Sequence, residues 1–404
     1  MAGSRGEKRQ SYLLIFLICA TLFTTGILDG YRSVILPIIK TAFEASYDSQ
    51  GLFNSLYSVG HILACFTTSV TLRKLGVRGT LITAYCVLML SFVGMQFVSS
   101  FAMATAAFVL LRFGLSCEEG GVNGMSNTFG LRTAKILSFG HFFYGVGSII
   151  GPKIAGAVLG TGVDWRRLYL FTIVLPLCFT VLALFIKIAP APAAGREQEN
   201  TGRAFRASDA LKRKEVWLFA LCIAVIGQVE TATTIWGGLY LQDNFGIDPL
   251  TVGATFMSVH FLLFTLGRLI CSVLIEKVGP VKMEYFLLLG CVLTFGVGFL
   301  LGANGLYALS AVGLFTSGIW PTVVAMSSMV YKKSGYAPIC MSVAGGISGI
   351  LTAIFAFLVG LVNQYVGPAW GFRTTVLMSV VAIALFTYTV RDVRRRGLYP
   401  AANA

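Results

Sequence analysis

Long apolar stretches separated by short polar loops make up almost the whole chain. A helix that crosses a bilayer needs roughly 20 apolar residues, and the sequence contains twelve stretches that meet this need. They lie at about residues 12–41, 50–71, 79–99, 102–127, 136–160, 168–189, 216–242, 250–274, 283–302, 305–330, 338–363 and 372–390. The pattern predicts an all-α integral membrane protein with twelve transmembrane helices and no soluble domain.

Composition agrees with this prediction, and charge adds an orientation. Of the 404 residues, 56% are hydrophobic and 12% are charged, whereas soluble domains carry about 25% charged residues. The net charge of +14 would suggest nucleic acid, but most Lys and Arg lie on alternate loops and at the termini. This distribution predicts cytoplasmic termini and a multi-pass protein of the cell (cytoplasmic or inner) membrane, with lipid but no nucleic acid as partner. The nine Cys have no metal or disulfide spacing, so we expect small buried apolar residues and no metal.

A polar segment divides the predicted helices into two groups of six. We expect a six-helix bundle at 1–189, a basic cytoplasmic linker at 190–214 and a second bundle at 215–404. The octapeptide from Ser69 to Gly76 parallels that from Ser272 to Gly279, in the matching loop of the other half. Such repeats are typical of two bundles around a central site, although short basic turns also recur at cytoplasmic loops.

The fourth apolar stretch carries two adjacent acids among glycines. Charged groups inside a membrane are costly and usually line an interior pathway. Glu119 and Asn123 are four residues apart and share a helix face, while Glu118 points about 100° away. Arg112 is also embedded. The alternative for Arg112 and Glu118 is a structural ion pair between helices.

Two other stretches carry acids beside further polar groups. Asp29 lies between Gly26 and Gly30 on the first helix, where it can face a cavity or be neutralised by Arg32. On the seventh, Gln228, Glu230 and Trp236 combine groups that hold hydroxyls with a ring that covers an apolar sugar face. Trp236 and Tyr240 could instead belong to the outer aromatic belt.

Polar side chains recur at helical spacing on three further helices. They are Asn54, Tyr57 and His61 on the second, His141, Tyr144 and Ser148 on the fifth, and His260 on the eighth. Such stripes either line a cavity or join helices by hydrogen bonds. We interpret Arg268, near the inner end of the eighth helix, as a structural residue that clamps the helix in place. Because the chain shows neither a nucleotide-binding glycine loop nor a nucleophile with a base in reach, we expect neither an enzyme nor a cofactor.

Four segments resemble the major facilitator superfamily and, within it, the fucose/glucose–galactose proton symporter group. They are the glycine-rich run around Glu119 and Asn123, the run from His141 to Pro152, the run from Gly227 through Trp236, and the run from Gly267 to Gly279. The resemblance implies the major facilitator fold. Two features depart from the group's pattern: the loop motif at Ser69 to Gly76 is degenerate, and Asp29 lies one turn before the expected place of the acid, which is Ser33 here.

These features together predict a monomeric, proton-coupled secondary transporter for a small polar solute, with a monosaccharide favoured. Glu119, Asp29, Glu118 and Arg112 are the candidates for proton coupling. The candidates for substrate binding are Asn123, Gln228, Glu230, Trp236, Asn54, Tyr57, His61, His141, Tyr144 and His260. Rocking of the two bundles would then expose the site to each side in turn. A proton-coupled exporter of cationic or amphiphilic compounds and a non-transporting membrane sensor are the alternatives.

Overall fold

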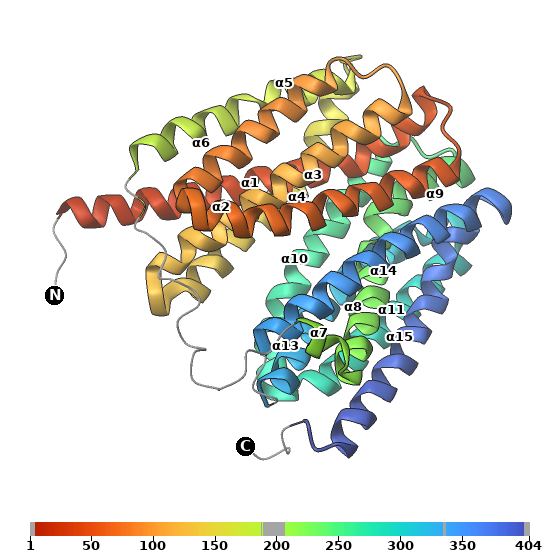
Figure 1. Cartoon of the computed structure of the whole chain (residues 1–404). Coiled ribbons are helices and arrows are strands. Elements are labelled where there is room, and N and C mark those ends of the chain that lie inside the picture. The colour runs from red at the N-terminus through yellow and green to blue at the C-terminus, as the bar shows by residue number, and fades with distance from the viewer. Residues whose placement is uncertain (1–4, 187, 189–206, 334–336, 400–404) are drawn as a thin grey trace. The chain divides into compact units, whose positions relative to one another are not determined.

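The computed structural model describes residues 5–186, 188, 207–333 and 337–399, and these are almost entirely helical (Figure 1). Its first half contains α1 (Arg5–Ala42), α2 (Tyr47–Met95), α3 (Phe101–Ser126), η1 (Asn127–Arg132), α4 (Thr133–Leu159), α5 (Trp165–Thr172) and α6 (Val174–Phe185). Its second half contains α7 (Ala207–Leu211), α8 (Lys214–Ala232), η3 (Thr233–Gly237), α9 (Gly238–Phe245), α10 (Val252–Val278), α11 (Pro280–Leu300), η4 (Gly302–Gly305), α12 (Leu306–Ala311), α13 (Gly313–Lys333), α14 (Ala337–Tyr365) and α15 (Trp370–Arg395). Within these residues, 11 helices are long and apolar enough to cross a membrane.

The helix α2 covers two of the predicted stretches, 50–71 and 79–99. Its 49 residues would extend about 74 Å as one straight helix, far beyond the roughly 30 Å of a hydrocarbon core. The backbone leaves the helical region at Gly76, with φ 67° and ψ −177°. At the corresponding place of the second half, Gly279 between α10 and α11 has φ 82° and ψ 152°. The two glycines of the repeated octapeptide therefore share a conformation that is essentially restricted to glycine.

The chain forms two compact units, and each unit includes one short segment from the other half of the sequence. Unit 1 contains Met1–Ala45, Leu56–Asn200 and Pro249–Ser258, and unit 2 contains Ser46–Ser55, Thr201–Asp248 and Val259–Ala404. The start of α2 therefore belongs to unit 2, where a Cβ on Gly51 would lie 2.9 Å from the Cα of Gly360. Most of the expected linker at 190–214 lies outside the described residues, and α7 begins within it.

Glycines bring α1 and α4 together inside unit 1. Gly26 and Gly30 of α1 face Gly147 and Gly151 of α4: a Cβ on Gly151 would lie 2.6 Å from the oxygen of Ile27. Small residues four apart on both helices allow this approach, the usual way for helices to pack in lipid. The contact fixes how the two helices are rotated and so which side chains meet.

A network of ion pairs joins the first turn of α8 to the end of α15 in unit 2. Arg396 lies 2.8 Å from Glu215 and 2.6 Å from Asp392, and Lys214 lies 2.7 Å from Asp392.

Three of the nine cysteines, Cys65, Cys86 and Cys178, are exposed. The expectation that all nine are buried was therefore wrong, because a helix in lipid can carry apolar side chains on its outer face as well.

Candidate functional site

A group of polar side chains from α1, α2, α3 and α4 gathers inside unit 1. Tyr144 of α4 donates a hydrogen bond from its hydroxyl to Oδ2 of Asp29, at 2.9 Å. The rings of Tyr144 and His141 lie 6.4 Å apart. The glycine contact between α1 and α4 positions this pair, because Gly26 and Gly30 flank Asp29 while Gly147 and Gly151 follow Tyr144.

Two arginines face the same aromatic ring in this group. The guanidinium carbon of Arg32 lies 4.3 Å from the centre of the Tyr57 ring, and that of Arg112 lies 5.6 Å from it. A cation over the face of an aromatic ring is attracted by the quadrupole of that ring. The charges of Asp29 and Glu119 act on Arg112. Among the ion pairs of the described residues there is none between Arg32 and Asp29.

His61 links α2 to α3 beside these arginines. Its Nδ1 lies 2.8 Å from the hydroxyl of Ser116 and 3.4 Å from Nη2 of Arg112. We define the N-terminal cluster as Asp29, Arg32, Tyr57, His61, Arg112, Glu119 and Tyr144. Its side chains come from four helices, and its two acids balance its two arginines. Such an arrangement can bind a neutral polar molecule and can also hold a proton on a carboxylate.

The two neighbouring acids of α3 take different surroundings. Glu118 is 3% exposed and accepts a hydrogen bond from the hydroxyl of Thr25 at 2.8 Å, so its side chain packs between α3 and α1. Glu119 is half-buried and Asn123 is exposed. The alternative of a structural ion pair between helices finds no support in the described part of the chain, where neither Arg112 nor Glu118 is among the ion pairs.

The polar stripe on α2 is divided between the two units. Tyr57 and His61 belong to unit 1, whereas Asn54 belongs to the segment Ser46–Ser55 of unit 2. Asn54 is 2% exposed and donates from its amide to the carbonyl of Gln50 at 3.0 Å. The i, i+3, i+7 spacing therefore marked a polar face without showing that its three members share one group.

Unit 2 contains an ion pair that joins α8 to α10. Nη2 of Arg268 lies 3.4 Å from Oε1 of Glu230, with the two side chains 39% and 16% exposed. The guanidinium of Arg268 also lies 4.7 Å from the centre of the Phe264 ring. Gln228, two residues before Glu230, donates to the carbonyl of Thr352 on α14 at 2.9 Å. Glu230, Arg268 and Gln228 form what we call the C-terminal cluster.

The helix that carries Glu230 changes its geometry before Trp236. Thr233–Gly237 form the π-helical turn η3. Such turns are rare and frequent at functional sites. Trp236 is 2% exposed and Tyr240 is 1% exposed, so neither lies in an outer aromatic belt, and Tyr240 packs 5.4 Å from Phe372.

Two further titratable side chains of unit 2, His260 and Glu284, are buried. His260 is 1% exposed and packs on α13, where a Cβ on Gly313 would lie 3.1 Å from its Nδ1. Glu284 of α11 is fully buried, and sequence reasoning missed it. The signal was available, because an acid stands near the start of the predicted stretch 283–302.

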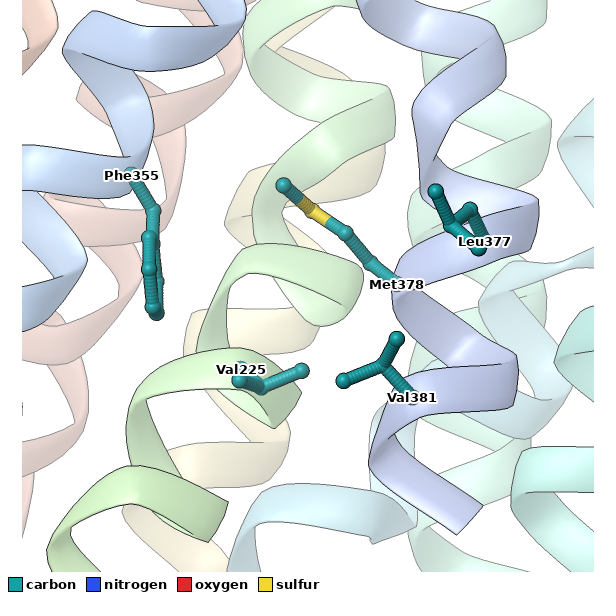
Figure 2. Close-up of a pocket in the computed structure, with 5 residues that line it drawn as sticks. All are labelled: Val225, Phe355, Leu377, Met378 and Val381. Atoms are coloured by element: carbon teal, nitrogen blue, oxygen red, sulfur yellow. The ribbon is translucent and has the colours of Figure 1, made fainter. Parts of the chain in front are cut away.

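A pocket of about 210 Å³ opens elsewhere in unit 2, between α8, α14 and α15. Figure 2 shows its lining, which consists of Val225, Phe355, Leu377, Met378 and Val381. These five side chains offer neither a hydrogen-bond donor nor a charge, so this pocket does not suit a sugar.

The family comparison assigns the chain. The family model described as Major Facilitator Superfamily matches residues 14–312, about three quarters of the sequence. The chain belongs to the Major Facilitator Superfamily. The resemblance noted in the sequence is thereby confirmed. Members of this superfamily are transporters, so this major facilitator is a multi-pass membrane transporter and not an enzyme.

Two sequence relatives are described as putative glucose/galactose transporters. The chain is 21% identical over 384 residues to a putative glucose/galactose transporter of one Helicobacter pylori strain, with 86% of this chain and 90% of the relative covered. It is 22% identical over 373 residues to the protein of the same description from a second strain, with 84% and 88% covered.

Solved structures agree on the fold. The nucleoside transporter NupG superposes with a TM-score of 0.71 at 13% identity, over 94% of this chain and 98% of that one. The E. coli fucose:proton symporter FucP superposes with a TM-score of 0.62 at 16% identity, over 93% and 98%. At these identities the likeness shows the major facilitator fold and does not identify the substrate of this chain.

Proposed function

We propose that this major facilitator is a proton-coupled symporter of a small polar solute, with a monosaccharide as the favoured substrate. The observation that carries the proposal is the N-terminal cluster, in which Asp29 accepts from Tyr144 beside two arginines and Glu119. A carboxylate held inside a membrane protein by a few polar partners can bind and release a proton. The glucose/galactose description of the two sequence relatives supports the choice of sugar.

The proposed topology has twelve membrane helices in two six-helix bundles, at 1–189 and 215–404, with both termini in the cytoplasm. The turn at Gly76 supports this number, because it divides the 49-residue α2 into two spans. The proposed protein is a monomer in the cell (cytoplasmic or inner) membrane. It works by alternating access, in which the two bundles rock and expose the substrate site to each side in turn.

In this mechanism Glu119 and Asp29 are the proposed proton-coupling groups, and Arg112 sets the charge around them. Glu118 was grouped with them; we now assign it to packing, because its side chain turns toward Thr25. For the sugar, we propose hydrogen bonds with Asn123, Gln228 and Glu230, whose carboxylate accepts, and contact with Trp236. The flanking candidates are Asn54, Tyr57, His61, His141, Tyr144 and His260.

Counterflow in proteoliposomes tests the proposal. The panel contains radiolabelled hexoses, nucleosides, which carry a sugar ring, and cationic dyes. We expect exchange of at least one hexose and pH-driven accumulation of the same compound. Efflux of dyes would indicate the exporter instead. The two guanidinium groups beside Tyr57 disfavour that alternative, because they repel a cationic substrate. Absence of all exchange would favour the sensor.

A further inference from the structure

Glu284 lies inside unit 2 with no partner for its charge. Its side chain is 0% exposed, and neither carboxyl oxygen has a hydrogen bond within the described part of the chain. No ion pair among the described residues includes it. The other buried acids of the described residues have donors: the hydroxyl of Thr25 for Glu118, and Arg213 and Arg396 for Glu215. Glu284 therefore has no evident structural contact to make.

An ionised carboxylate in such surroundings is far more costly than a neutral acid. Burying a charge without a partner costs several kcal/mol or more, whereas a carboxylic acid loses only the hydrogen bonds of a neutral group. A residue with a purely structural role would be a hydrocarbon at this position, since apolar neighbours pack as well and cost less. The surroundings of Glu284 thus favour its protonated form.

The titratable groups that interact with Glu284 are an acid and thiols, which do not neutralise its charge. The carboxylate of Glu230 on α8 repels a negative charge at Glu284, and the thiols of Cys222, Cys271 and Cys291 are affected by Glu284 in turn. The helices α13 and α15 also pack against α11. No titratable side chain in their described residues is found among the interactions of Glu284. Arg268, the nearby cation, pairs with Glu230.

We propose that Glu284 is a proton-binding site of unit 2, separate from Asp29 and Glu119. Release of the proton breaks the O–H bond at Glu284 and passes the proton to water. This step requires a conformation in which water reaches Glu284, because its carboxyl oxygens have no hydrogen bond in the described surroundings.

The place of Glu284 along α11 fits such a role. It lies about 6 Å along the helix axis from Pro280, at 1.5 Å per residue, and so close to one end of the span. Glu230 lies about 24 Å from the start of α8 by the same measure, near the middle of its span. Glu284 therefore lies closer to one end of its span than Glu230 does. For its part in transport, this proposal rests on the proposed proton coupling.

Infrared spectroscopy of the purified protein tests protonation without any transport. The stretch of a protonated carboxylic acid is separate from that of a carboxylate, and its intensity counts protonated groups. We expect E284Q to lose the intensity of one protonated carboxyl at neutral pH. The matched control is E276Q, on the exposed last turn of α10, which should keep the full intensity. Full intensity in E284Q would overturn the proposal.

A second measurement uses the wild-type protein and so does not depend on the folding of a variant. A hydrophobic carbodiimide reacts with protonated carboxyls in apolar surroundings, and peptide mapping identifies the labelled residue. We expect label on Glu284 that declines as the pH is raised. No label at Glu284 at any pH would overturn the proposal.

Proton counting in proteoliposomes then tests the role in transport. We expect E284Q to move one proton fewer per substrate than wild type, while exchange of substrate at equal pH stays within twofold. An unchanged proton count would remove Glu284 from the cycle. If wild type itself moves no protons with substrate, the proposed symport fails, and the infrared result on Glu284 is read independently of it.

Discussion

The hydroxyl of Tyr144 lies 2.9 Å from Oδ2 of Asp29 and joins α4 to α1 at the centre of the N-terminal cluster. A hydrogen bond to a charged group contributes about 1.5–3 kcal/mol, enough to decide the rotamer of a carboxylate. In Y144F we expect Asp29 to lose this orientation and the rate of uptake to fall about tenfold, with the fold intact. Initial rates of hexose uptake measure this.

The control for Tyr144 is Tyr85, whose buried hydroxyl lies 2.8 Å from that of Thr21. Y85F removes a hydrogen bond of the same kind outside the N-terminal cluster. It should lower the temperature of unfolding slightly and leave uptake within twofold. Equal losses of uptake in Y85F and Y144F would mean that the hydroxyl of Tyr144 serves only packing.

The second prediction concerns Glu119. Gln has the shape of a protonated Glu but exchanges no proton, so E119Q should lose pH-driven accumulation and keep substrate exchange. The neighbouring E118Q is the matched control: its amide can still bond to Thr25, and accumulation should persist. Counterflow and uphill uptake are measured on the same vesicles. Full proton-driven uptake by E119Q would remove Glu119 from the coupling groups.

The sequence predicted much of this architecture and little of the pairing inside it. Apolar length alone indicated the membrane helices, although α2 covers two of the twelve predicted stretches. The i, i+3, i+7 spacing placed Tyr57 and His61 on one face. Hydrophobicity does not say which face of a membrane helix points inward, since lipid is as apolar as the core. Glu230 pairs with Arg268, 38 residues away, and Glu118 bonds to Thr25, 93 residues away. Glycine contacts such as that of Gly151 with α1 set these rotations.

A third prediction tests the ion pair of the C-terminal cluster. E230A should weaken substrate binding by roughly 1–3 kcal/mol, because a charged hydrogen bond is lost, and should leave Arg268 without its anion. In a double-mutant cycle with R268A, the two effects should fail to add by at least 0.5 kcal/mol, as expected for residues in contact. Binding of the hexose chosen by counterflow is measured by calorimetry.

The control pair is Arg166 with Asp164, 2.7 Å apart with the acid half exposed. Exposed pairs of this kind contribute about 0–1 kcal/mol, and D164N should leave binding unchanged. If E230A binds with wild-type affinity in a folded protein, the ion pair of Glu230 with Arg268 is structural.

The fourth prediction concerns the close packing of α1 on α4. In G151A the new Cβ would lie 2.6 Å from the oxygen of Ile27, a backbone atom that cannot turn away. Overpacking of this kind costs about 1–3 kcal/mol, so G151A should unfold at a lower temperature. G296A is the matched change in α11, where a Cβ meets nothing within 4 Å. It should raise stability by about 0.5–1 kcal/mol, since Gly is a poor helix former. Thermal unfolding in detergent distinguishes the two signs.

The last prediction tests the internal repeat through its two glycines. Gly76 and Gly279 both have positive φ, and a Cβ at either place would meet nothing within 4 Å. Any cost of alanine there must therefore come from the backbone and not from a clash. Residues other than glycine lose about 1–3 kcal/mol in this region of φ and ψ. G76A and G279A should thus be destabilised by similar amounts although they lie in different units, and G296A should not be. A loss at one of the two positions alone would show that the shared octapeptide does not correspond to a shared turn.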